Sequence, residues 1–267
     1  MIYFCQNILF RQGEKSVNRI TFFDRQHHTD FIMFSSSHIV AMSLVACFCL
    51  LLYGARFSLR SNPGARTFVR LLLAAVLVFS EGGLQIWYIS QEAWKKGSSL
   101  PLELCGITLL LSILMLLTRS RLLYSFLYFA GTGGAFIALL TPNLVYPFPH
   151  FRFLLFFVAH GGIILASLYM TWIEGCRPTW KSLFFTMLCL NIIAALVYAA
   201  DRALGANYMF LADKPGTFSV LDYFGPYPYY LLVEEVFAFV VFLLMYLVFF
   251  RLPQRFSARH DRRRRIM

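Results

Sequence analysis

Among the cysteines and histidines of this 267-residue chain, Cys105 and His160 form the candidate pair for nucleophilic chemistry. A thiol attacks as its thiolate, and an imidazole can accept the proton. Cys105 lies in the stretch Leu-Pro-Leu-Glu-Leu-Cys-Gly-Ile-Thr at 100–108, and His160 precedes Gly161 and Gly162. The glycines allow a helix or a ligand to approach closely. Without a shared site, Cys105 is a small apolar packing residue and His160 a hydrogen-bonded packing histidine.

Other polar residues lie within apolar stretches, where a charged group is costly and usually faces a bundle interior. Glu81 and Gln85 are four residues apart, so a helix places them on one face. Glu234 and Glu235 are adjacent, so at most one of them faces the core squarely. The candidates for orienting a catalytic group or holding a substrate are Glu81, Gln85, Glu103, Asn191, Glu234, Glu235 and His38.

The composition indicates a polytopic membrane protein. The chain is 59% hydrophobic and 18% aromatic, with a mean hydropathy of +0.64, which is outside the range of soluble proteins. The net charge of +11 does not indicate nucleic-acid binding, because the basic residues flank apolar spans and seven arginines lie in the last 17 residues. The six cysteines have no metal-ligand spacing, so neither a metal site, a cofactor nor a disulfide framework is predicted.

Apolar runs of about 20 residues cross a bilayer as helices, so the expected fold is an all-α bundle of about seven spans. An extracytoplasmic tail is expected at 1–36, the transmembrane domain at 37–250 with a lid-like loop at 201–227, and a basic cytoplasmic tail at 251–267. The glycines of Gly-Thr-Gly-Gly at 131–134 predict a close helix contact. The predicted spans are 37–55, 67–92, 101–117, 122–140, 152–172, 180–200 and 228–250.

Basic residues predict the orientation. Of the 24 lysines and arginines, 15 fall on one side of the spans and nine on the other. The positive-inside rule therefore places the N-terminus outside and the C-terminus in the cytoplasm of a cell-membrane protein. Cys105 then lies about 6 Å below the outer surface and His160 about 12 Å below it, with Glu234 and Glu235 at about 10 Å. The polar groups thus form one layer in the outer half of the membrane.

The spacing of Glu103 and Cys105 raises a geometric conflict. Residues two positions apart on a regular helix are separated by about 200° around its axis, so both side chains cannot point the same way. Either Glu103 faces the interface, or the turn at Pro101 is irregular.

Several motifs carry a resemblance to a known family. They are Phe-Phe-Asp at 22–24, Ser-Ser-His at 36–38, Leu-Pro-Leu-Glu-Leu-Cys at 100–105, His160-Gly161, Asn207-Tyr208, Lys214-Pro215 and the Gly-Pro-Tyr-Pro-Tyr-Tyr that opens the last span. The chain resembles the YwaF-like bacterial integral membrane proteins, which look related to the eukaryotic family of transmembrane protein 164. The resemblance runs from about Phe22 to Arg251 and implies a compact bundle of six or seven helices with an intramembrane polar site.

The resemblance also implies an activity. The eukaryotic branch is associated with acyl transfer into phospholipids through a cysteine acyl intermediate, and a more distant branch hydrolyses lipid esters. The family's cysteine corresponds to Cys105 and its histidine to His160, whereas Glu103 stands where a histidine is expected. The leading expectation is a lipid acyltransferase or acyl hydrolase whose partners are membrane lipids, including a lysophospholipid and an acyl donor.

The alternative is a non-enzymatic seven-helix transporter or sensor, in which Glu81, Glu103, Glu234 and Glu235 bind cations, protons or a small ligand. No internal repeat of the kind that transporters contain is evident. The sequence does not indicate an oligomeric state.

Overall fold

The computed structural model describes residues 22–25, 31–214 and 220–252. Most of the expected tails, 1–36 and 251–267, therefore lies outside the described residues. The regular elements of the described part are all helical. They are α1 (Ser36–Ser61), α2 (Pro63–Ser90), α3 (Leu104–Thr118), α4 (Arg121–Leu140), α5 (Phe151–Trp172), α6 (Trp180–Leu204), η1 (Tyr208–Phe210), η2 (Val220–Phe224), α7 (Tyr229–Tyr246) and η3 (Leu247–Arg251).

The all-α fold of seven main helices is confirmed. Six of the helices are long and apolar enough to cross a membrane, whereas α3, with 15 residues, is shorter. Two helices start three or more residues from the predicted position. Asn62 caps α2 by accepting a bond from the amide of Ala65, and Pro63 occupies the first position, where it needs no acceptor. The turn at 101–103 delays α3 to Leu104. The inside–outside orientation stays a prediction.

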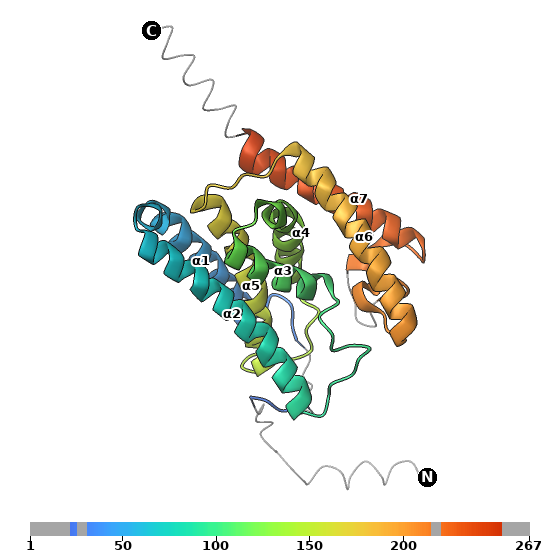
Figure 1. Ribbon diagram of the computed structural model, residues 1–267. Helices are drawn as coiled ribbons and strands as arrows, with labels where there is room; N and C mark the ends of the chain where they lie inside the picture. Colours follow the sequence, from blue (N-terminus) through green and yellow to red (C-terminus); the bar gives the residue numbers. More distant parts are fainter. Residues whose placement is uncertain (1–21, 26–30, 215–219, 253–267) are drawn as a thin grey trace, which may run out of the picture.

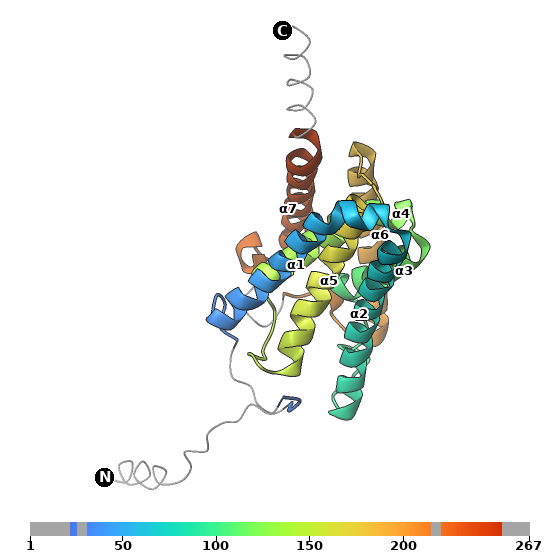
Figure 2. The same cartoon turned by 90° about the vertical axis from the view of Figure 1, so that its left-hand side faces the viewer.

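Helix α5 occupies the middle of the bundle. It packs against α1, α2, α3 and α4, while α6 and α7 pack against α4 and against each other. Figure 1 shows the α1–α2 pair on one side of α5 and the α6–α7 pair on the other, and Figure 2 gives the same arrangement from the side. The central position of α5 is reflected in its burial. In its most apolar 18-residue stretch 61% is buried, compared with 6% in the corresponding stretch of Tyr229–Arg251, which contains α7.

Glycines permit the closest helix approaches. A Cβ added to Gly162 of α5 would lie 2.8 Å from Leu77 of α2, and one added to Gly133 of α4 would lie 3.2 Å from Phe242 of α7. Both distances are too short for an ordinary side-chain contact. The predicted helix contact at 131–134 is therefore confirmed.

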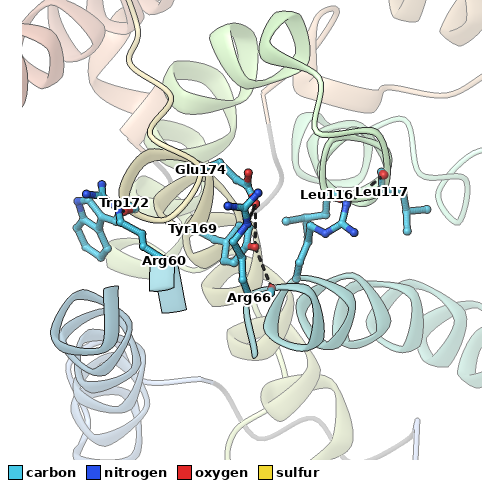
Figure 3. Close-up of polar contacts among 8 residues, drawn as sticks. Arg60, Arg66, Leu116, Leu117, Tyr169, Trp172 and Glu174 are labelled. Atoms are coloured by element: carbon cyan, nitrogen blue, oxygen red, sulfur yellow. Dashed lines mark hydrogen bonds and ion pairs between the residues drawn. The ribbon is translucent and has the colours of Figure 1, made fainter. Parts of the chain in front are cut away.

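Arginines hold one end of the bundle, which we name the basic end: α1, α3 and α5 finish there, and α2, α4 and α6 begin. Arg60 donates from Nε to the carbonyl of Trp172 at 2.7 Å, and Arg70 donates to the carbonyl of Leu116 at 3.0 Å (Figure 3). The last carbonyls of a helix have no intrahelical donor, so these guanidiniums satisfy the ends of α5 and α3.

A further network at the basic end joins α2 to the chain after α5. The Nε of Arg66 lies 3.1 Å from Oε1 of Glu174. The hydroxyl of Tyr169 is within bonding distance of that same oxygen, at 3.0 Å, and of the Arg66 carbonyl, at 2.9 Å (Figure 3). The opposite end, which carries the connections 91–103, 141–150, 205–214 and 220–228, is named the loop end.

Candidate functional site

A cavity of about 350 Å³ at the loop end brings the two candidate catalytic residues together. Cys105 of α3 and His160 of α5 both line it, and so do Glu81, Gln85 and Glu103. Five of the nine residues singled out from the sequence therefore meet around one space. We name it the loop-end cavity.

The ring of His160 is held in one protonation pattern. Its Nδ1 lies 2.8 Å from the carbonyl oxygen of Phe156. Because a carbonyl only accepts, Nδ1 carries the hydrogen, and the neutral ring keeps its lone pair on Nε2. A neutral imidazole with a free Nε2 is the form that a general base requires.

Cys105 and His160 share the cavity without a hydrogen bond between them in the described structure. A substrate hydroxyl or a water molecule between them would complete the connection.

Cys105 lies in the first turn of α3, where backbone donors are unused. Among the described residues, the N–H groups of Leu104, Cys105 and Gly106 have no acceptor, and the Glu103 side chain does not cap the helix. The first N–H groups of a helix have no partner within the helix and carry the positive end of its dipole. Such a position favours negative charge that develops next to Cys105.

Glu103 precedes α3 rather than lying within it. Its backbone is extended, with φ −63° and ψ 150°, so the 200° conflict with Cys105 does not arise and both residues line the cavity. Its Oε2 accepts a hydrogen bond from the amide of Met209 at 3.0 Å. The sequence alternative of an irregular turn at Pro101 is thus the one found.

The environment of Glu103 affects its charge. Burial raises the pKa of its carboxyl, the bond from Met209 lowers that pKa, and the negative charge of Asp201 raises it. A carboxyl that keeps its proton more readily places less negative charge beside the Cys105 thiol.

The loop after α6 is fastened to the stretch that leads into α3. The Tyr208 hydroxyl accepts from the amide of Leu100 and donates to the carbonyl of Lys96, both at 3.0 Å. The Tyr208 amide donates to Oδ1 of Asp201 at 3.0 Å. Phe210, two residues on, lines the loop-end cavity. The loop predicted as lid-like therefore forms part of the cavity wall.

Glu81 and Gln85 share a face of α2, as their spacing predicts. Gln85 donates from Nε2 to Oε1 of Glu81 at 2.8 Å and to the carbonyl of Ser99 at 2.9 Å. Its Oε1 accepts from the indole of Trp94 at 3.1 Å. Gln85 thus connects α2 to the loop at 91–103, and Glu81 presents a carboxylate to the cavity.

Sequence reasoning missed Arg152, which also lines the loop-end cavity. Its guanidinium lies over the rings of Trp87 and Tyr88, 5.2 Å and 4.9 Å from their centroids. Its terminal nitrogen Nη1 is buried and has no hydrogen-bond partner in the described residues. The signal was its spacing: residues 152, 156 and 160 lie four apart, on the helix face that carries His160.

His38 lies outside the loop-end cavity and is fully buried. Its Nδ1 accepts from the amide of Phe34 at 2.9 Å, so its Nε2 donates to the carbonyl of Leu139 at 2.8 Å. Both ring nitrogens are therefore used to join the start of α1 to the end of α4.

Asn191, Glu234 and Glu235 also lie away from the loop-end cavity. Asn191 of α6 donates to Oε1 of Glu235 on α7 at 2.6 Å. Glu234 and Glu235 are thus on a different helix pair from Glu81 and Glu103. No three His, Cys, Asp or Glu side chains of the described chain gather as a metal site requires.

The Phe-Phe-Asp motif fixes the described N-terminal segment to the loop end. Trp87 donates from its indole to the carbonyl of Phe23 at 3.0 Å. His150 accepts the amide of Arg152 at Nδ1 and therefore donates from Nε2 to the carbonyl of Asp24, at 3.0 Å. The segment thus braces the helix start from which Arg152 projects.

Comparisons with known proteins agree with this architecture. The sequence profile of the TMEM164 family matches residues 33–246. An uncharacterized protein of Treponema pallidum (strain Nichols) is 26% identical over 227 residues, which cover 82% of this chain and 90% of that protein. No solved structure matches the chain. Because the profile covers most of the sequence and the helices have the length and polarity of membrane spans, the chain belongs to the TMEM164 family of multi-pass membrane proteins.

Proposed function

We propose that this protein is an intramembrane lipid acyltransferase or acyl hydrolase, with Cys105 as nucleophile and His160 as general acid and base. The observation that carries the proposal is the loop-end cavity. Cys105 and His160 both line it, and Nδ1 of His160 is hydrogen-bonded to the carbonyl of Phe156. A cavity lined by both polar and apolar side chains suits a lipid ester, which joins a polar headgroup to an acyl chain.

The first step forms an acyl-enzyme. His160 Nε2 takes the thiol proton, and the sulfur of Cys105 attacks the ester carbonyl carbon. The C–O bond to the lipid alcohol then breaks, and the alcohol oxygen takes the proton back from His160. The products are an S-acyl Cys105 and a lysolipid with a free hydroxyl.

The second step removes the acyl group. A lysophospholipid hydroxyl, or water in the hydrolase, gives its proton to His160 Nε2 and attacks the thioester carbonyl. The C–S bond breaks, the sulfur recovers the proton, and the acyl group leaves as a new ester or as a fatty acid. The nature of the attacking hydroxyl distinguishes transferase from hydrolase.

Two further features support the mechanism. The unused N–H groups at the start of α3 lie beside Cys105, where they would stabilise the negative oxygen that develops during attack. The buried Nη1 of Arg152, without a partner in the described residues, offers a charged donor to the phosphate of a phospholipid. Glu103 accepts a hydrogen bond from Met209 and so holds the loop after α6. In this motif its role is to keep that loop in place as part of the cavity wall.

The test compares Cys105→Ala with Cys49→Ala in purified full-length protein. Cys49 is a half-buried cysteine of α1 outside the cavity. With a phospholipid donor and a lysophospholipid acceptor, Cys105→Ala is expected to lose activity by on the order of a thousandfold, because the nucleophile is gone. Cys49→Ala is expected to keep it. Mass spectrometry of the wild-type protein should find an acyl thioester on the peptide that contains Cys105. Undiminished turnover in Cys105→Ala would reject the cysteine mechanism.

A further inference from the structure

A second and larger cavity lies toward the basic end, among α4, α5 and the last helix. Its volume is about 720 Å³, and its walls are mostly apolar, including Phe136, Ile164, Leu168, Leu244 and Val248. It has no lining residue in common with the loop-end cavity. We name it the basic-end cavity.

The polar edge of this cavity is positively charged. Arg60 and Arg177 line it, and no acidic residue is among its lining residues. Arg60 is fixed by its Nε bond to the carbonyl of Trp172 at 2.7 Å, which leaves its two terminal nitrogens to other acceptors (Figure 3). Arg177 has an exposed side chain. An anion with an apolar body matches this combination of charge and wall.

The dimensions and surroundings favour a membrane lipid as that anion. The wall contributed by the last helix runs from Val241 to Phe250, which is about 13 Å at the rise of an α-helix. Leu244 and Phe249 on this wall are 54% and 64% exposed, so apolar side chains of the wall are accessible from outside the bundle. Basic pockets between membrane helices are known to hold anionic headgroups.

We propose that the basic-end cavity binds one anionic phospholipid, with an acyl chain along the walls formed by α4, α5 and the last helix and the phosphate at Arg60 and Arg177. This site is separate from the proposed acyl-transfer chemistry, because neither Cys105 nor His160 lines it. The bound lipid fills the space between α7 and the bundle core.

The experiment uses the full-length protein and native mass spectrometry, with phosphatidylglycerol and phosphatidylcholine as probes. Wild type is expected to retain phosphatidylglycerol in preference to phosphatidylcholine. Each arginine near an anionic headgroup contributes about fivefold in affinity. Arg177→Gln is therefore expected to bind phosphatidylglycerol about fivefold more weakly, and the Arg60→Gln, Arg177→Gln double variant about 25-fold more weakly. Val248→Trp, which fills the apolar part, should retain less of it.

Arg56→Gln is the matched control, since Arg56 lies one turn before Arg60 but donates to the carbonyl of Tyr53 and does not line the cavity. It should bind phosphatidylglycerol as the wild type does. Cys105→Ala should do so too, which separates this proposal from the catalytic one. Equal retention of both lipids by the wild type, wild-type affinity in the double variant, or an equal loss in Arg56→Gln would overturn the proposal. Because Arg177→Gln removes no hydrogen bond within the described chain, its result holds even if Arg60→Gln weakens the fold.

Discussion

The two cavities lie along the same helix but differ in chemistry. Residues of α5 from Arg152 to Ile163 line the loop-end cavity, and those from Ile164 to Trp172 line the basic-end cavity. The first cavity is lined by a thiol, an imidazole, two side-chain amides and two carboxyls in addition to Arg152. The second is apolar along its length and charged only at the edge. Helix α5 thus lines one cavity whose groups suit the proposed acyl transfer and another whose walls suit the acyl chain of a lipid.

The comparison shows which polar residues to regard as functional. His38, Asn191 and Glu235 are polar residues of membrane helices, and each is hydrogen-bonded to another part of the fold. Within the described residues, several unpaired groups instead belong to residues that line the loop-end cavity: the amides of Cys105 and Gly106, Nη1 of Arg152 and Nε2 of His160. The buried Oδ2 of Asp201, also unpaired there, is not at this cavity. An unpaired polar group in an apolar setting is costly, so its repetition around one space indicates a ligand.

The largest expected effect comes from His160. His160→Ala removes the proposed general base and should lower turnover by about 10²- to 10⁴-fold. Thr171→Val removes a polar group from the same helix at the other cavity, and it should leave turnover within a factor of about two. Steady-state rates with a phospholipid donor, beside thermal unfolding of both variants, provide the measurement. An equal loss of turnover at the two positions would erase the functional difference between the cavities.

A smaller effect is expected at Arg152. Arg152→Gln removes one charged hydrogen bond to a lipid phosphate, worth about 1.5–3 kcal/mol, so KM for a phospholipid should rise by about 10- to 150-fold. KM for a monoacylglycerol, which lacks the phosphate, should stay the same. Arg56→Gln controls for the loss of one positive charge. A parallel rise of KM for both substrates would mean that Arg152 shapes the cavity without binding phosphate.

The smallest expected effect concerns Glu103 and the loop that it holds. Glu103→Ala removes the acceptor for the Met209 amide, and the loss of a hydrogen bond of about 1 kcal/mol should speed hydrogen exchange of that amide roughly fivefold. Glu103→Gln keeps an acceptor oxygen and should exchange at close to the wild-type rate. Exchange mass spectrometry on peptides covering 205–214 measures both. Unchanged exchange in Glu103→Ala would show that the loop is held by Tyr208 alone.

Much of the fold followed from the sequence because the signals are strong. Runs of about 20 apolar residues admit only helices in a bilayer, and the seven predicted spans correspond to α1–α7. The pairing of Glu81 with Gln85 also followed from local spacing. The start of α3 did not: its non-helical turn at 101–103 is stabilised by contacts to Tyr208 and Met209, more than 100 residues away, and no local pattern encodes those contacts.

The site was only partly predictable for the same reason. Depth along each helix placed Cys105 and His160 in one layer, and they line one cavity. Depth also placed Asn191 and Glu235 there, yet those two bond to each other on α6 and α7. Depth does not tell which helices are neighbours. Arg152 was overlooked because it begins its helix, a position typical of a surface charge, although its spacing to His160 puts it on the cavity face.

The arginine contacts at the basic end impose an order on biogenesis. Arg60 of the first hairpin bonds to Trp172, 112 residues later in the chain, and Arg70 bonds to Leu116, 46 residues later. When α1 and α2 leave the ribosome, neither acceptor has yet emerged from it. Until α3 and then α5 arrive, the two guanidiniums need other acceptors, which a polar headgroup region can offer. The first two helices thus carry contacts that only the third and fifth helices complete.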